Sequence, residues 1–193
     1  MTGHPAACLR FGLIALAAIS GDTASFAQRA DRTPPPAVST SAGQFHAHRL
    51  TRPPVLDGRV WIAAVVTTAS SPGTVPVPQP GFALTLTGCG DVGDFVRCQV
   101  FFQRGRTAPV RIDDGFTGWV FVTPDGRYVV MEPLHVLDVR AWTRYRLSEV
   151  LHIPNYTKIE AVSPDGQHLL VTRRDCAIDC GDVPVEFYDL ALP

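Results

Sequence analysis

The residues of this 193-residue chain that are best suited to ligand chemistry lie near its C-terminal end. The run Asp175-Cys-Ala-Ile-Asp-Cys-Gly-Asp182 carries three carboxylates, those of Asp175, Asp179 and Asp182. Carboxylate oxygens are ligands that Ca²⁺ prefers, but the run lacks the terminal bidentate Glu of a calcium-binding loop. A surface turn rich in Asp and Gly fits the same residues. We therefore interpret the three aspartates as a candidate partner-binding loop, with Ca²⁺ binding as the alternative.

Two histidines, His46 and His48, would lie on one face of a strand, a spacing that can seat a metal ion. No third ligand stands near them in the sequence, and exposed histidines are the simpler interpretation. The chain contains neither a Gly-x-Ser-x-Gly nucleophile motif nor a His-Glu-x-x-His zinc motif. The carboxylates of Asp113 and Asp114 would point to opposite faces of a strand, which argues against an acid/base pair. We interpret these two residues as a turn before Gly115. The sequence thus predicts no catalytic residue, no cofactor and no metal.

The N-terminal residues resemble a secretory signal peptide. Arg10 precedes an apolar run over residues 11–19, and small residues at 25 and 27 would suit cleavage before Gln28. Nine apolar residues are fewer than the roughly 20 that span a bilayer, so we expect no stable membrane insertion after cleavage of residues 1–27. The expected location is periplasmic or secreted. Lys plus Arg number 17 against 18 Asp plus Glu, without a basic cluster, which argues against nucleic-acid binding.

Four cysteines follow the expected cleavage site, and an even number in an exported chain favours disulfides. Three connectivities are possible, and proximity in the sequence favours two local bridges. Zinc is the alternative, although the spacings differ from those of zinc knuckles. The favoured pairs are Cys89 with Cys98, and Cys176 with Cys180.

The elements that would position these residues are strands. We expect a disordered Pro- and Ser-rich leader over residues 28–43 and a single β-rich domain over residues 44–193. Residues 60–66 predict a strand buried on both faces. Residues 82–88 and 96–102 predict a hairpin that a Cys89–Cys98 bridge would pin. Ser148 is expected to cap one helical turn.

The domain divides into a divergent half, residues 44–115, and two repeat units within residues 117–192. Each unit has a Pro-Asp-Gly turn between two apolar runs, and a third apolar run follows. Pro supplies a turn φ, Asp bonds its own backbone and Gly tolerates a positive φ, so each turn predicts a hairpin. The structural turn residues are Pro124, Asp125 and Gly126 in the first unit and Pro164, Asp165 and Gly166 in the second.

This pattern resembles the blade repeat of TolB-type and related β-propellers, over residues 117–192 only. The resemblance implies four-stranded antiparallel blades packed face to face, and commonly a scaffold for protein contacts. The chain has room for at most four such blades. We therefore expect an all-β fold of antiparallel blade-like sheets, arranged as an irregular sandwich or as a small or incomplete propeller-like domain.

The expected function is that of an exported, non-enzymatic protein-interaction module in the bacterial envelope, whose partner is another envelope or secreted protein. One alternative is a periplasmic module that binds a small ligand or Ca²⁺. A second is an immunity or inhibitor protein for an exported toxin or hydrolase, and a third is a cryptic hydrolase. Open sheet edges would also permit self-association. Trp119, Trp142, Tyr145 and Tyr156 could line a ligand site, although aromatic residues of β proteins more often fill the core.

Overall fold

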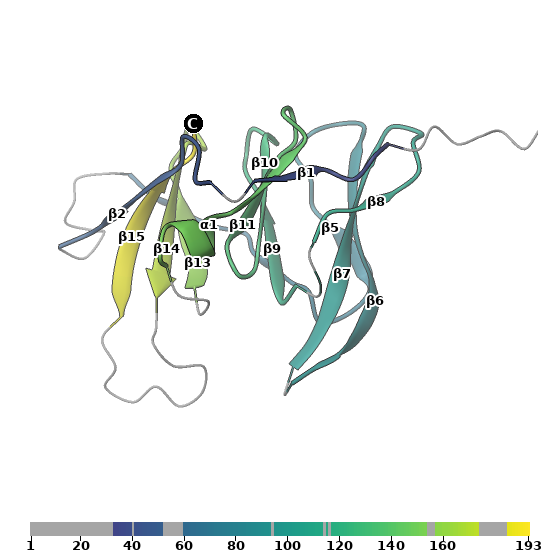
Figure 1. The fold of residues 1–193 in the computed structure, drawn as a ribbon, viewed down its shortest axis with the longest axis horizontal. Coiled ribbons are helices and arrows are strands. Elements are labelled where there is room, and N and C mark those ends of the chain that lie inside the picture. The colour runs from purple at the N-terminus through teal and green to yellow at the C-terminus, as the bar shows by residue number, and fades with distance from the viewer. Residues whose placement is uncertain are drawn as a thin grey trace, which may run out of the picture.

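The fold is all-β, as the sequence predicts. A computed structural model describes residues 33–39, 41–51, 60–93, 95–113, 115, 117–153, 157–173 and 185–193. Three sheets of mainly antiparallel strands stack face to face (Figure 1). The sheet around strands β13 (Thr157–Val162) to β15 (Glu186–Ala191) lies at one end, the sheet around β9 (Trp119–Val122) to β12 (Thr143–Arg146) in the middle, and the sheet of β5 (Gly73–Val75) to β8 (Val110–Arg111) at the other end. Within the described part of the chain, no helix is long and apolar enough to cross a membrane.

The middle sheet is an up-and-down meander in which each strand pairs with the next one along the chain. Two short outer strands extend it, β4 (Thr67–Thr68) beside β9 and β1 (Ala37–Ser39) parallel to β12. Its four central strands are β9 (Trp119–Val122), β10 (Tyr128–Met131), β11 (His135–Asp138) and β12 (Thr143–Arg146).

One end sheet combines the two ends of the chain. Its core strands are β13 (Thr157–Val162), β14 (His168–Arg173) and β15 (Glu186–Ala191). Strand β2 (His46–Arg49) pairs antiparallel with β15, and β3 (Ile62–Ala63) pairs with β13. A strand from the N-terminal part therefore completes the C-terminal sheet.

The other end sheet is a four-stranded antiparallel sheet built around one long hairpin. Its strands, in order, are β5 (Gly73–Val75), β6 (Phe82–Val92), β7 (Phe95–Arg104) and β8 (Val110–Arg111). The hairpin confirms the prediction for residues 82–102, with strands longer than expected.

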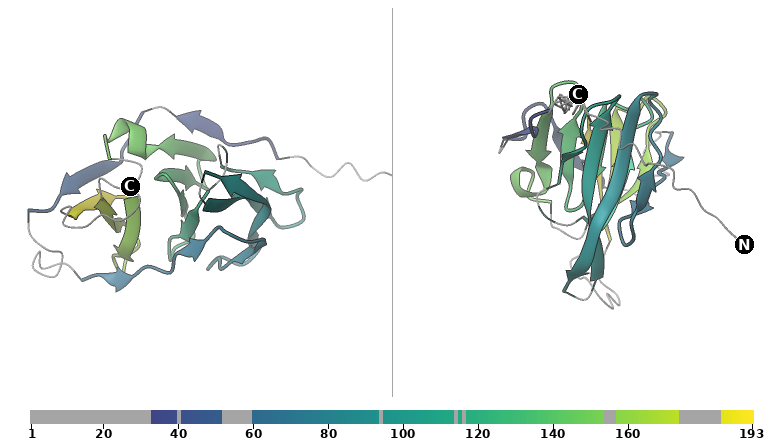
Figure 2. Two further views of the ribbon diagram at one scale, coloured as in Figure 1. Left: turned by 90° about the horizontal axis from the view of Figure 1, so that it is seen from below. Right: turned by 90° about the vertical axis from the view of Figure 1, so that its right-hand side faces the viewer.

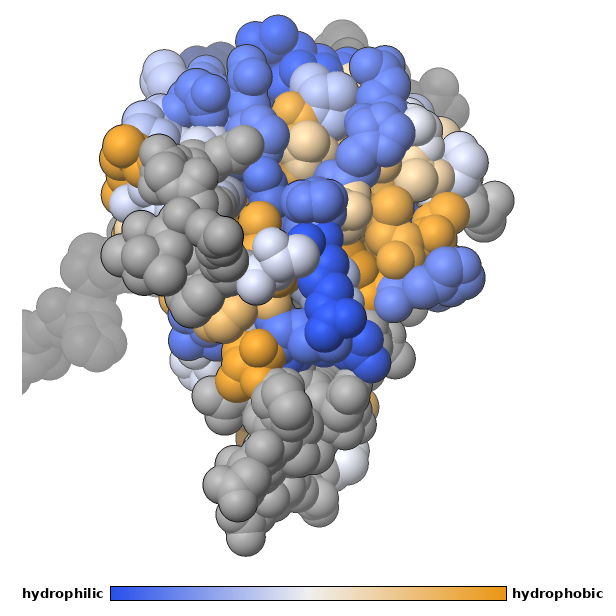
Figure 3. Space-filling view, turned by 90° about the vertical axis from the view of Figure 1, so that its left-hand side faces the viewer, coloured by the Kyte–Doolittle hydropathy of each residue, from blue (hydrophilic) through white to orange (hydrophobic). Residues whose placement is uncertain are grey.

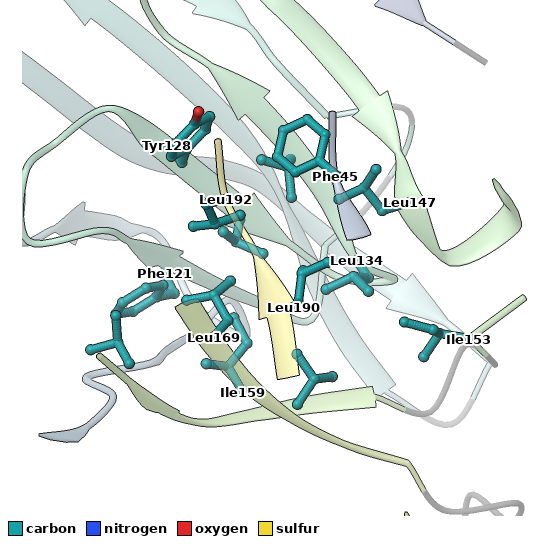
Figure 4. Close-up of a cluster of buried hydrophobic side chains, with 14 residues drawn as sticks. Phe45, Phe121, Tyr128, Leu134, Leu147, Ile153, Ile159, Leu169, Leu190 and Leu192 are labelled. Carbon is teal, nitrogen blue, oxygen red and sulfur yellow. The ribbon is translucent and has the colours of Figure 1, made fainter. Parts of the chain in front are cut away.

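The middle sheet separates two hydrophobic cores, and β10 contributes to both. Tyr128 and Val130 pack into the core shared with the β13–β15 sheet, while Val129 and Met131 pack into the core shared with the β5–β8 sheet. Successive side chains of a strand point to opposite faces, so a strand between two cores supplies apolar side chains to both of them. Figure 4 shows the first core, where Phe45, Leu147 and Leu190 converge from separate elements.

The first Pro-Asp-Gly turn connects β9 to β10 through a compact hydrogen-bond network. The hydroxyl oxygen of Thr123 accepts the Tyr128 N–H at 3.0 Å, and the Asp125 carboxylate accepts the Arg127 N–H at 3.0 Å. Gly126 donates its N–H to the Thr123 carbonyl at 2.8 Å and adopts a φ of 67°. The turn residues thus hydrogen-bond to one another.

The second turn, between β13 and β14, repeats this network. The Ser163 hydroxyl accepts the His168 N–H at 2.9 Å, and Asp165 accepts the Gln167 N–H at 3.0 Å. Hydrogen bonds from Ser163 and Gln167 lower the pKa of Asp165 below its ordinary value. Gly166 has a φ of 72°, which glycine adopts at no steric cost.

The predicted disordered leader is wrong for the segment that forms β1. Residues Ala37–Ser39 pair with β12, and the Trp142 indole N–H donates to the Pro34 carbonyl at 2.7 Å. Proline favours an extended chain, which is the conformation that can add to the unpaired edge of a sheet.

Residues 60–66 do not form one buried strand. Within this segment the only strand is the two-residue β3, at the edge of the β13–β15 sheet, and β4 follows directly at the edge of the middle sheet. Val60, Ile62 and Val65 are 68%, 50% and 74% exposed. The β-branched run indicated strand propensity correctly, but propensity does not determine burial.

Ser148 is not a helix cap. Helix α1 (Leu147–Val150) begins after Arg146, so Ser148 lies inside it and is buried. The Leu147 side chain is fully buried in the first core, and the helix starts two residues earlier than a cap at Ser148 predicts.

Replacing Gly126 should destabilise the fold more than replacing Gly105, which also has a positive φ. An added Cβ at Gly126 would overlap the Gln79 side chain, whereas the space around Gly105 is open. Backbone strain alone should cost Gly105→Ala about 1 kcal/mol, and Gly126→Ala should cost about 1 kcal/mol more. Urea denaturation of both variants measures this difference, and equal losses would contradict the close approach of Gln79.

Buried His135 should make stability depend on pH. Burial, with a further contribution from the Arg146 guanidinium, lowers the pKa of His135 below its ordinary value. Below about pH 6.5 the unfolded chain then binds a proton that the folded state excludes, so stability should fall as the pH drops toward the folded pKa. Urea denaturation at several pH values should show a smaller loss for His135→Gln than for the native protein, while His46→Gln, an exposed control, should show the native loss.

Candidate functional site

The hairpin of β6 and β7 extends beyond the sheet that contains it. Strand β5 pairs with β6 only over residues 84–86, and β8 pairs with β7 only at Phe101 and Phe102. Past Thr87 and Gln99 the two strands continue as a ribbon, visible in the right-hand view of Figure 2. Among the described residues, no further strand pairs with the ribbon, and its edges are unpaired except at Cys98.

A disulfide fixes the base of this ribbon. Cys89 and Cys98 are bonded, which confirms the predicted pair, and their Cα atoms lie 3.9 Å apart. The ladder is irregular between Thr87 and Gly90, and Cys98 also exchanges backbone hydrogen bonds with Thr117 at 3.3 and 2.9 Å. A two-stranded hairpin alone is marginally stable in water, so these ties replace the flanking strands that the ribbon lacks.

The tip of the ribbon is apolar and exposed. Val92, Phe95 and Val96 are 37%, 50% and 45% exposed, and Gly93 supplies the turn with a φ of 61°. Scattered exposed apolar residues are ordinary. Val92 and Phe95, however, are direct partners in the ladder, so their side chains lie on one face of the tip, while Val96 lies on the other face. Covering these exposed apolar side chains with another apolar surface lowers the free energy, because it removes them from water.

Arg97 connects the ribbon to the middle sheet. Its guanidinium lies 3.0 Å from the Glu132 carboxylate, next to the turn between β10 and β11, and 5.9 Å from the centroid of the Phe95 ring. Gly118 leaves the space that this carboxylate occupies, since a Cβ there would overlap Glu132. These contacts orient Phe95 relative to the body of the protein.

The outer face of the β13–β15 sheet gathers the histidines that the sequence singled out. His46 and His48 lie on β2 as expected, and His48 is directly opposite Asp189 of β15. His168 Nδ1 lies 2.8 Å from Asp189 Oδ1. This end of the molecule carries hydrophilic residues along its middle, flanked by hydrophobic ones (Figure 3). The sequence did not reveal Asp189 and His168 as neighbours because they meet only through sheet pairing.

Metal ligation gains no support from the described residues. Among them, no three His, Cys, Asp or Glu side chains are placed to hold a metal ion. The candidate loop with Asp175, Asp179 and Asp182, and the predicted Cys176–Cys180 bridge within it, lie outside the described residues.

Asp113 is a structural residue that joins two strands. Its carboxylate accepts the Val100 N–H at 2.6 Å and bonds the Arg111 guanidinium, while burial raises its pKa above the ordinary value. Beside it, the Arg144 guanidinium donates to the Ile112 carbonyl at 2.7 Å and connects the middle sheet to the β5–β8 sheet. Asp114 lies outside the described residues.

The apolar tip is the feature that sequence reasoning missed. The sequence predicts a hairpin with arms at residues 82–88 and 96–102, which makes the segment between them a connection without a role of its own. The signal was present, because Val92, Phe95 and Val96 interrupt a run of turn formers. An apolar side chain in a turn at the end of a hairpin is too far from the core to be buried there, so its exposure could have been predicted.

Breaking the Cys89–Cys98 bond should lower the free energy of unfolding by about 2 to 3 kcal/mol in the chain-entropy model. Guanidinium denaturation of the Cys89→Ala, Cys98→Ala double variant measures this loss. Dithiothreitol-treated native protein serves as the matched control and should unfold at a midpoint lowered in the same direction. Identical midpoints for the oxidised and the reduced protein would show that the bond does not stabilise the fold.

No protein-family model matches this chain, and neither a curated protein nor a solved structure matches it significantly. Any functional assignment therefore rests on the sequence and on the geometry of the described residues.

Proposed function

We propose that the protein is an exported, non-enzymatic module that binds another envelope or secreted protein through the tip of the β6–β7 ribbon. The observation that carries the proposal is the exposed pair of Val92 and Phe95 on one face of a disulfide-fixed ribbon, with Val96 exposed on the other face. The partner surface would be an apolar cleft that accepts the Phe95 ring.

The energetics suit reversible recognition. Full burial of a large apolar side chain is worth about 1.5 to 3 kcal/mol, and the three tip residues are already half to two-thirds covered by the fold. The tip would therefore supply an apolar anchor for the partner. Backbone hydrogen bonds along the unpaired ribbon edges would add to the binding free energy. Because the disulfide holds the ribbon in one conformation before contact, less ordering entropy opposes binding.

Export is part of the proposal, and the disulfide supports it. Such bonds persist in oxidising compartments and are rare in the cytosol. The signal-like residues 1–27 point to the same compartment, although they lie outside the described residues. The resemblance of the Pro-Asp-Gly repeats to TolB-type propeller blades also supports a scaffold for protein contacts over a reaction centre.

Site-specific photo-crosslinking in the native cells tests the proposed surface. Benzoylphenylalanine at position 95 should capture one dominant exported protein, because that side chain would enter the partner's cleft. The same probe at Val38 is the matched control, since Val38 is 47% exposed against 50% for Phe95 but lies on β1. Equal capture from both positions, or none from position 95, contradicts the proposal.

A substitution then tests the anchor itself. With the probe at Val96, the additional change Phe95→Ser should reduce capture about tenfold, equivalent to about 1.4 kcal/mol. The additional change Val38→Ser should leave capture unchanged. Circular dichroism should show the same melting temperature for both variants, so that a loss of capture reports recognition and not folding.

A further inference from the structure

A second feature lies at the opposite end of the same hairpin, where β7 and β8 meet the turn between β11 and β12. A cavity of about 260 Å³ opens there between the β5–β8 sheet and the middle sheet. Ligand pockets commonly have volumes of about 300 to 1,000 Å³. This cavity therefore suits a ligand of one or two small rings and is too small for a nucleotide cofactor.

The floor of the cavity is aromatic and apolar. The Phe102 ring lies 5.5 Å from the Trp142 ring at an angle of 50°, and Val139 closes the wall between the two sheets. The Trp142 indole N–H already donates to the Pro34 carbonyl. Since its polar edge is satisfied, the indole offers the cavity a π surface on which a flat ring can pack.

The rim of the cavity is cationic. Arg104 donates to the Val139 carbonyl at 3.1 Å, which holds its guanidinium at the rim, and packs over the Phe82 ring at 5.2 Å. Arg140 is exposed, and its backbone N–H, at 2.8 Å, bonds Asp138. The hydrogen bonds and ion pairs between described residues leave the Arg140 guanidinium unpaired, and the described residues that line the cavity include no Asp or Glu.

We propose that this cavity binds a small aromatic carboxylate. The ring of the ligand would pack against Phe102 and Trp142, and its carboxylate would lie between Arg104 and Arg140. Guanidinium groups bind carboxylates through charge-assisted hydrogen bonds, which are about twice as strong as neutral ones. The described lining residues thus combine aromatic rings and two guanidinium groups, with no carboxylate. This combination matches a ligand that has a flat apolar ring and a single negative charge at one end.

Binding here is independent of the ribbon tip. Phe82 pairs with Arg104 at the open end of the hairpin, whereas Val92 pairs with Phe95 at its closed end. The proposal therefore stands or fails separately from partner recognition by Phe95.

Calorimetric titration of the disulfide-bonded protein tests the cavity. Phenylacetate and indole-3-acetate are the probes, each beside its neutral amide. At least one acid should bind saturably at millimolar or lower concentration, and its amide should bind about tenfold more weakly because the charge-assisted bonds are lost. Absence of saturable binding by both acids, or equal binding of acid and amide, overturns the proposal.

Two arginine variants locate the site. Arg140→Gln should weaken acid binding about tenfold without changing the unfolding midpoint, because its guanidinium forms no bond in the described fold. Arg106→Gln is the matched control, an exposed arginine of the β7–β8 loop outside the cavity, and should bind as the native protein does. Native affinity in Arg140→Gln would show that the acid binds elsewhere.

Discussion

Burial of the middle sheet on both faces is the constraint on which the rest of the structure depends. Tyr128 and Val130 face one core and Val129 and Met131 the other, so β10 holds both end sheets in place. All four residues of this strand, Tyr128–Met131, are buried, and the only polar side-chain group among them is the Tyr128 hydroxyl, which donates to the Pro193 carbonyl. The end sheets need only one apolar face each, which leaves the outer face of each sheet free for polar residues.

The stacked body gives the functional elements a rigid base. The β6–β7 hairpin is anchored in the second core through Leu84, Val100 and Phe102, and its far end projects as the disulfide-fixed ribbon. At its near end, the junction between two sheets leaves the aromatic and arginine-rimmed cavity. Both features arise where a strand extends past its partners or where two sheets do not fill the space between them. The two hydrophobic cores between the sheets, by contrast, stabilise the fold.

Local features were predictable from the sequence, and long-range ones were not. The Pro-Asp-Gly turns and the Cys89–Cys98 pair depend on residues close together in the chain. The pairing of β2 with β15 joins distant segments, and no local pattern in His46–Arg49 specifies that partner. The cavity likewise needs Phe102 and Trp142 from different sheets. Residues 60–66 show the limit most clearly, since their apolarity predicted burial where the chain only crosses between edges.

Hydrogen exchange, followed residue by residue in the oxidised protein, tests this architecture most directly. If the middle sheet organises the fold, the amides of β10 should exchange slowest, through global unfolding. Those of the ribbon, residues 90–97, should exchange through local opening at much lower free energy. Reduction of the disulfide should speed exchange in the ribbon more than in β10. Exchange in β10 as fast as in the ribbon would contradict a body organised around a doubly buried sheet.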